Sequence, residues 1–415
     1  MTNPKTKAIL FAQYPYSEER LWGMTLTEKL VRQLSVAGIE YCTIYFNPDR
    51  EIALRKDLKK WHPLDVEFKS LNASEGETLV DHLKLDPSNY LVLQGNTIVD
   101  PRILDLLIEK ASGNETINIQ SGDHAPAAFT ITSGVIDKIK PESDLIAVAK
   151  STSTETVKTS DMDSYIAKMR RRMEPFLFEI DNPEILKKVE KVAFTSIYKG
   201  ATDFITKYVW PLPTRWMVHL ISPTGITPNQ ITYVSMVLSF GAIPFFFMGW
   251  FWIAWIMGIV MSFLDTLDGK LARLTQRTSD AGHWLDNASD TIYLWLWYAG
   301  IGWYFAEDIL DFQDINVIAA WSLVGFFTID KIITGLFKKL FGAQLHDFAP
   351  IDWHARVYIA RRNPFLVVLL IGLIINDPVF GLHAMAVWQT ATFAFHMMRF
   401  IYLPLTGQKH QIHRK

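Results

Sequence analysis

Long apolar runs in the second half of the chain constrain its fold more than any other feature. A helix needs roughly 20 apolar residues to cross a bilayer. Six segments read as spans, the fifth being short: 229–248, 251–273, 282–305, 317–337, 364–375 and 379–403. These runs predict an all-α integral membrane domain of six transmembrane helices.

Charges between the runs predict how this domain is oriented. The loop at 307–314 carries four acidic residues and no Lys or Arg. The basic residues fall at the opposite helix ends: Lys270, Arg273, Arg277, Lys338, Lys339, Arg356, Arg361, Arg362 and the tail at 409–415. Because cytoplasmic loops are enriched in Lys and Arg, both termini and the aspartates at 265–290 are expected at the cytoplasmic face, which is the inner membrane if the source is bacterial.

The first half of the chain has a different character. Charges occur throughout residues 1–190, and short apolar runs such as KAILFA, YCTIYF and NYLVLQ alternate with an amphipathic segment at 25–37. Alternating strand and helix patterns predict an α/β, Rossmann-like domain with a mostly parallel sheet. The fold class is therefore a two-domain chain, α/β followed by all-α.

Composition narrows the partners and the compartment. The formal net charge of −2 gives the chain no overall basic character, so nucleic acid is not expected as a partner. Cys42 is the only cysteine, so no intramolecular disulfide forms, as is typical of a reducing cytosol. The opening MTNPKTKAILFAQYPYSEER has too short an apolar run and too many charges for a signal peptide, so the first half is expected in the cytoplasm.

A connecting segment joins the two halves. In SIYKGATDFITKYVWPLPTRWMVHLI, residues 196–221, aromatic and aliphatic residues recur among charges. That pattern fits an amphipathic helix at the membrane interface or a buried connector helix. The predicted boundaries are a cytoplasmic domain at 1–190, a juxtamembrane segment at 191–225, a membrane domain at 226–405 and a basic tail at 406–415.

Four aspartates lie in DTLDGKLARLTQRTSDAGHWLDNASD, residues 265–290. Asp265 and Asp268 are three apart and Asp286 and Asp290 four apart, so each pair lies along one helix face. Carboxylates crowded together repel one another and take up protons unless a cation is bound. Hard divalent cations prefer oxygen ligands, and four carboxylates suit a two-metal site. The alternatives are helix caps, exposed interfacial residues, or an ion pathway.

The same stretch fits the pattern D-x2-D-G-x2-A-R-x8-G-x3-D-x3-D, which resembles the signature of the CDP-alcohol phosphotransferases. The matching positions are Asp265, Asp268, Gly269, Ala272, Arg273, Gly282, Asp286 and Asp290. The resemblance implies transfer of a substituted phosphate from a CDP-alcohol, such as CDP-diacylglycerol, to an acceptor hydroxyl with release of CMP. It also implies a homodimer and two divalent cations, Mg²⁺ or Mn²⁺.

Residue roles follow from the resemblance. The metal ions would be held by Asp265, Asp268, Asp286 and Asp290, and Asp290 would also act as general base. Contacts to the CDP group would come from Gly269, Ala272, Arg273, Gly282, Asn229 and Thr232. For Asn229 and Thr232 the alternative is an ordinary helix start with Pro228 in its first position. Arg356, Arg361 and Arg362 could bind a phosphate-bearing acceptor or serve as cytoplasmic-side anchors.

The first half resembles a sugar-phosphate nucleotidyltransferase domain, with two departures. The loop after the first strand, QYPYSEERLWG, contains only Gly23, where a Gly-rich, Arg-containing loop is expected. Asn96 stands where a metal-binding Asp is expected, and a neutral amide is a weak Mg²⁺ ligand. A domain that keeps the fold without the chemistry is the prediction.

Three functions are compatible with these features. The first is a single-activity transferase whose acceptor is inositol phosphate or glycerol phosphate, with a lipid alcohol as an alternative acceptor. The second is a bifunctional enzyme whose first half also makes a CDP-alcohol, which predicts CTP-dependent product formation. The third is a carboxylate-based ion transporter, which predicts ion flux without CMP release.

Overall fold

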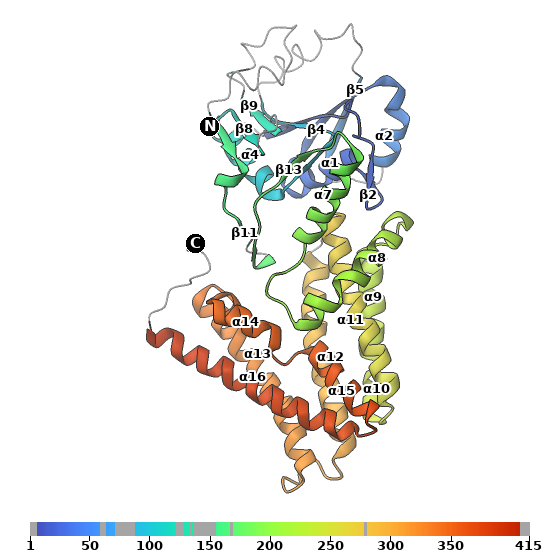
Figure 1. The fold of residues 1–415 in the computed structure, drawn as a ribbon, viewed down its shortest axis with the longest axis vertical. Helices are drawn as coiled ribbons and strands as arrows, with labels where there is room; N and C mark the ends of the chain where they lie inside the picture. The colour runs from blue at the N-terminus through green and yellow to red at the C-terminus, as the bar shows by residue number, and fades with distance from the viewer. Residues whose placement is uncertain are drawn as a thin grey trace. The chain divides into compact units, whose positions relative to one another are not determined.

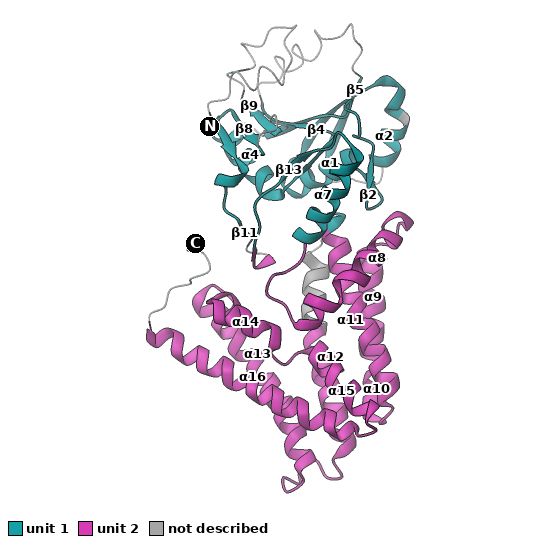
Figure 2. Ribbon diagram, viewed as in Figure 1, with its two compact units in different colours: residues 1–166, 172–196, 274–276 teal, residues 167–171, 197–273, 277–415 magenta. Residues whose placement is uncertain are grey.

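The computed structural model describes residues 6–58, 64–70, 88–121, 128–132, 135, 155–166, 169–277 and 280–406, without the side chains of residues 52 and 280–289. The chain divides into two compact units (Figure 2). Unit 1 comprises Met1–Ile166, Arg172–Ser196 and Leu274–Gln276. Unit 2 comprises Ala167–Arg171, Ile197–Arg273 and Arg277–Lys415.

Unit 1 is built on a seven-stranded sheet (Figure 1). In spatial order its strands are β10(Glu155–Lys158), β8(Ile117–Gln120), β9(Ala128–Ile131), β6(Asn89–Gln94), β1(Thr6–Phe11), β4(Tyr41–Phe46) and β5(Asp65–Ser70). β1 pairs in parallel with both β4 and β6, whereas β9 runs antiparallel to its neighbours β6 and β8. The prediction of an α/β domain with a mostly parallel sheet is confirmed.

Helices and short strands complete unit 1. They are β2(Arg20–Leu21), β3(Met24–Thr25), α1(Leu26–Val36), η1(Pro48–Arg50), α2(Glu51–Leu58), β7(Thr97–Val99), α4(Pro101–Ser112), η2(Thr159–Asp161), β11(Tyr165–Ile166), β13(Leu177–Glu179) and α7(Pro183–Ser196). The side chain of Thr25 caps α1 by accepting from Glu28 N at 3.1 Å. Asp100 caps α4, where Pro101 pre-sets the first turn.

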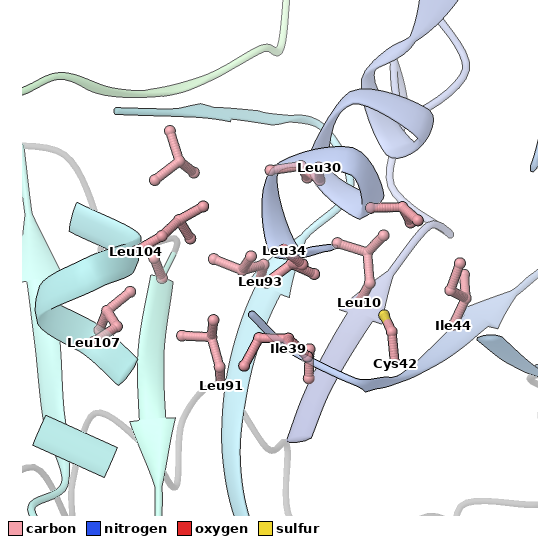
Figure 3. Close-up of a cluster of buried hydrophobic side chains, with 14 of the residues drawn as sticks. Leu10, Leu30, Leu34, Ile39, Cys42, Ile44, Leu91, Leu93, Leu104 and Leu107 are labelled. Atoms are coloured by element: carbon pink, nitrogen blue, oxygen red, sulfur yellow. The ribbon is translucent and has the colours of Figure 1, made fainter. Parts of the chain in front are cut away.

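Leucines from strands and helices meet in the core of unit 1 (Figure 3). Leu30 and Leu34 of α1 and Leu104 of α4 pack against Leu10 and Leu93 of the sheet, and all five are at most 1% exposed. Burying one leucine side chain stabilises a fold by about 1.5–3 kcal/mol. These contacts make unit 1 a domain with its own core.

Unit 2 is all-α, as predicted. Its elements are η4(Ile205–Val209), α8(Pro211–Ile221), η5(Ser222–Thr224), α9(Pro228–Gly241), α10(Ile243–Phe247), α11(Phe251–Leu274), α12(Asp280–Phe305), α13(Ile315–Phe341), η6(Leu345–Asp347), α14(Pro350–Tyr358), α15(Arg362–Ile374) and α16(Pro378–Thr406). The two-residue strand β12(Arg171–Arg172) falls at the boundary of the two units.

Four helical segments of the described chain are long and apolar enough to cross a membrane: Pro228–Phe247, Phe251–Leu274, Ile315–Phe341 and Pro350–Ile374. They make unit 2 an integral membrane domain. α12 and α16 are helical over the two remaining expected spans, but the six-span count is not confirmed and stays a prediction. In α16 the buried face carries Gln389, Thr392, His396 and Arg399, which lower its hydropathy.

Aromatic packing fixes the helices of unit 2. Trp297 of α12 is fully buried, lies 5.3 Å from the ring of Phe246, and donates from Nε1 to the Ser239 carbonyl at 2.9 Å. A Cβ on Gly258 of α11 would lie 2.8 Å from Leu366 Cδ2 and 3.2 Å from the Trp297 ring. A Cβ at this position would therefore force Leu366 or Trp297 to shift, and glycine lets α11 lie against both side chains without that shift.

Candidate active site

The motif aspartates lie on two helices of unit 2. α11 carries Asp265 and Asp268 close to its carboxyl end, and α12 carries Asp286 and Asp290 in its first half. The surroundings of Gly282 and the side chain of Asp286 lie outside the described residues, whereas Asp265, Asp268 and Asp290 are described with their side chains.

Arg362 brings Asp265 and Asp290 together. Its Nη2 donates to Asp265 Oδ2 at 2.5 Å, and its Nη1 donates to Asp290 Oδ1 at 3.2 Å. The Tyr293 hydroxyl donates to the same Asp290 oxygen at 2.6 Å and accepts from Arg362 Nη1 at 2.5 Å. Two carboxylates from different helices thus converge on one cation, which is the donor chemistry that a divalent cation requires.

Asp268 has a different partner. Thr232 of α9 donates its hydroxyl to Asp268 Oδ2 at 2.5 Å, and Asp268 is only 6% exposed. The sequence predicts for Thr232 either a nucleotide contact or a place in an ordinary helix start, and in the structure its hydroxyl lies against a motif carboxylate. Hydrogen bonds of this kind orient the ligands of metal ions in proteins.

Asn229 lies at a helix start, and Gly269 lies beside an arginine. Asn229 is exposed in the first turn of α9, which has Thr227 and Gln230 as a capping box and Pro228 as its first residue. This matches the ordinary helix start given as the alternative. Gly269 faces the Arg273 guanidinium, whose Nη2 would lie 3.3 Å from an added Cβ. Among the described residues no group of three acidic, His or Cys side chains is arranged to hold a metal ion.

Cations from several segments gather beside the aspartates. Arg361 Nη1 lies 3.7 Å from Asp203, and the buried Nε of Arg356 has no hydrogen-bond partner in the described part of the chain. Loss of hydration on burial and, to a smaller extent, repulsion from Arg273, Arg170 and Arg361 together lower the pKa of Lys199 to about 8. The three arginines predicted for the acceptor, Arg356, Arg361 and Arg362, therefore have different surroundings. Arg362 is held by the motif carboxylates, whereas Arg356 and Arg361 lie near other cationic side chains.

Sequence reasoning missed Asp203, Asn363 and Lys199. Asn363 Nδ2 donates to Asp203 Oδ1 at 2.8 Å although the two residues are 160 positions apart. Asp203 and Lys199 belong to no sequence motif. Asn363 directly follows Arg361 and Arg362, but no spacing pattern in the sequence indicates that it belongs to the site. The sequence indicated Asp203 only by its acidic side chain within the amphipathic segment 196–221.

Comparisons with known proteins found relatives of part of the chain. Residues 225–406 match the family model for CDP-alcohol phosphatidyltransferase. A bifunctional IPC transferase and DIPP synthase from Aquifex aeolicus is 33% identical over 118 residues, which make up 28% of this chain and 27% of that relative. An archaetidylinositol phosphate synthase from Pyrococcus horikoshii is 25% identical over 179 residues, or 42% of this chain and 82% of that relative.

A solved structure also resembles part of the chain. The 4-diphosphocytidyl-2C-methyl-D-erythritol synthase of Anaerococcus prevotii is 12% identical, and the match covers 46% of this chain and 96% of that one with a TM-score of 0.34. A score this low does not establish a common fold, so the α/β architecture of unit 1 rests on its own sheet order. The family model, in contrast, covers both motif helices, and residues 225–406 therefore form a domain of the CDP-alcohol phosphatidyltransferase family.

Proposed function

We propose that the chain is a membrane transferase that moves a substituted phosphate from a CDP-alcohol, such as CDP-diacylglycerol, to an acceptor hydroxyl and releases CMP. The observation that carries this proposal is the convergence of Asp265 and Asp290 on Arg362, within a domain of this family. Matched segments cover only part of the first relative, so the activity of the whole chain is inferred from the site.

The donor set fits two divalent cations, Mg²⁺ or Mn²⁺. Asp265, Asp268, Asp286 and Asp290 would hold them, because acceptor-only carboxylate oxygens are what these ions prefer. Bound cations would neutralise the diphosphate of the donor. Arg362 forms ion pairs with Asp265 and Asp290, which supports the proposal that these carboxylates lie beside positive charge.

The chain's own residues supply the proton chemistry. We assign Asp290 as the general base, which takes the proton of the acceptor hydroxyl as that oxygen bonds to the phosphorus bearing the alcohol. The bond between this phosphorus and the bridging oxygen breaks, and CMP leaves with the electron pair. Tyr293 donates to Asp290 and so orients its carboxylate. Gly269, Ala272, Arg273 and Gly282 would lie along the CDP group.

The acceptor that we favour carries a phosphate of its own, as inositol phosphate and glycerol phosphate do. Lys199, Arg356 and Arg361 provide positive charge next to the motif, and guanidinium groups bind phosphate oxygens well. The name of the Pyrococcus horikoshii relative also refers to an inositol phosphate product. We further propose six transmembrane helices, cytoplasmic termini and a homodimer.

The test is CMP release by the full chain in detergent. CDP-diacylglycerol, Mg²⁺ or Mn²⁺ and one acceptor at a time would be supplied, the acceptors being inositol phosphate, glycerol phosphate, inositol and diacylglycerol. Acceptor-dependent CMP release that falls about 10²-fold or more in Asp290→Asn supports the proposal. Asp308→Asn, in the exposed acidic loop, is the matched control. Absence of CMP release with every acceptor would reject it and leave ion transport as the alternative.

A bifunctional enzyme is the second candidate, because the Aquifex aeolicus relative bears that description. Unit 1 does not support it. Asn96, at the position of the expected metal-binding Asp, is 3% exposed and donates to the Ile180 carbonyl at 3.1 Å, which is a structural role. Incubating the full chain with CTP and inositol phosphate distinguishes the two, since only the bifunctional enzyme would release diphosphate.

A further inference from the structure

Asp203 is a buried acid outside the motif. It precedes η4 and is 4% exposed. Its carboxylate accepts from Thr206 N at 3.0 Å, from the Thr206 hydroxyl at 2.9 Å and from Asn363 Nδ2 at 2.8 Å. Arg361 Nη1 lies 3.7 Å away. A carboxylate with this many partners is held in one orientation.

Asn363 connects Asp203 to the motif helix. Its Nδ2 donates to both Asp203 and the Thr206 hydroxyl, the latter at 3.1 Å, and its Oδ1 accepts from the hydroxyl of Ser262. Ser262 lies on α11, three residues before Asp265. The segment at 203–206, the start of α15 and the motif helix are therefore joined by one chain of hydrogen bonds.

The start of α15 needs such support for electrostatic reasons. Arg361 is its N-cap and Arg362 its first residue, so two guanidinium groups lie at the positive end of the helix dipole. Asp265 and Asp290 neutralise Arg362, and Asp203 is the carboxylate that faces Arg361. Burial alone would raise the pKa of Asp203, but Arg361 and the hydrogen bonds from Asn363 and Thr206 outweigh it and lower that pKa.

Arg361 and Arg362 thus face different carboxylates. Arg362 is fixed by the motif carboxylates, while Arg361 faces Asp203 with its Nη1, 3.7 Å from the carboxylate. The backbone N–H of Ala360 donates to Thr392 of α16 at 2.8 Å, which fixes the turn from its other side. The side chain of Arg361 is intermediate in exposure, so an incoming anion can reach it.

We propose that Asp203 is a positioning residue for the acceptor site. It acts through Thr206 and Asn363 to hold the 360–363 turn, so that Arg361 faces the phosphate of the acceptor while Arg362 stays on the motif aspartates. The inference rests on the proposed function, because it assigns the acceptor a phosphate group. Asp203 itself touches neither substrate.

Thr206 offers a test that leaves charge unchanged. Thr206→Val keeps the side-chain shape but removes the hydroxyl between Asp203 and Asn363, and Thr206→Ser retains it. If Arg361 has no fixed orientation, ordering its side chain on binding makes the binding free energy of the acceptor less favourable. We expect KM for inositol phosphate to rise about fivefold or more in Thr206→Val, with KM for CDP-diacylglycerol unchanged and Thr206→Ser close to the parent.

Asp203 is tested with an exchange. Asp203→Asn should raise KM for inositol phosphate, and the double change Asp203→Asn with Asn363→Asp should recover part of that rise, because it restores the acid–amide hydrogen bond but moves the carboxylate from position 203 to position 363. Thermal unfolding of each variant in detergent reports folding separately. The inference would be overturned if every variant kept the parent's KM for both substrates and lost only kcat, because the fraction of folded protein had fallen. Absence of CMP release by the parent chain would instead reject the proposed function.

Discussion

Arg362 donates to Asp265 across 2.5 Å and so joins the first residue of α15 to the motif helix α11. The same guanidinium reaches Asp290 of α12, so three helices meet at one charge cluster. A cation at a helix N-terminus is unfavourable by itself, and here two carboxylates offset that cost. Arg362 therefore holds Asp265 and Asp290 close to each other.

The first prediction concerns competition between Arg362 and the metal. Arg362→Gln removes a positive charge from beside Asp265 and Asp290, so Mn²⁺ affinity should increase about tenfold, which equals about 1.4 kcal/mol. Mn²⁺ binding to the purified protein, followed by electron paramagnetic resonance, measures this. Arg361→Gln is the control and should change the affinity much less. Unchanged Mn²⁺ affinity with a raised acceptor KM would show instead that Arg362 binds the acceptor.

The second prediction concerns Thr232. Thr232→Val removes the hydroxyl that donates to Asp268 Oδ2, and Thr232→Ser keeps it. Because partners of metal ligands set their orientation, kcat/KM for CMP release and Mn²⁺ affinity should both fall by about 10-fold or more in the valine variant. Equal activity of the two variants would mean that this hydrogen bond does not orient Asp268 during the reaction.

The motif made the positions of the aspartates predictable. Spacings of three and four residues place side chains on one helix face, and in the structure Asp265 and Asp290 do converge. The partner of Asp268 was not predictable in the same way. Thr232 is 36 positions from Asp268, and its expected role was a nucleotide contact. Local spacing predicts a face, but only tertiary packing determines what that face meets.

Asp203 and α16 show what the sequence alone could not predict. Asp203 accepts from the nearby Thr206 but also from Asn363 of α15, 160 residues away, and no local pattern encodes that second contact. α16 was predicted as a span from its apolar content, and it is a helix of the expected position. However, its buried face carries His396 and Arg399, paired with Asp330 and Asp352, so hydropathy alone does not describe it.

A third prediction follows from the pKa of Lys199, which is near 8 against an ordinary 10.5. Lys199 is charged below about pH 8 and loses its charge above it, so KM for inositol phosphate should rise as the pH passes through 8. Between pH 8 and 10.5 the unfolded chain binds more protons than the folded one, so this lysine makes stability increase with pH in that window. Lys199→Met should raise Tm at pH 7 and remove the pH dependence of KM. A dependence that persists in this variant would assign it to another group.

The last prediction concerns the ion pair between Asp352 of α14 and Arg399 of α16. Both side chains are buried, and two hydrogen bonds of 2.6 and 2.8 Å join them. Asp352→Ala leaves an uncompensated guanidinium in the interior, which should cost about 3–5 kcal/mol and lower Tm in detergent. Replacing both partners, Asp352→Leu with Arg399→Met, should recover most of that loss because no buried charge remains. Arg55→Ala, at an exposed pair with Glu51 in unit 1, is the control and should leave Tm nearly unchanged. If the double variant is no more stable than Asp352→Ala, the pair contributes specific packing between α14 and α16 rather than charge compensation.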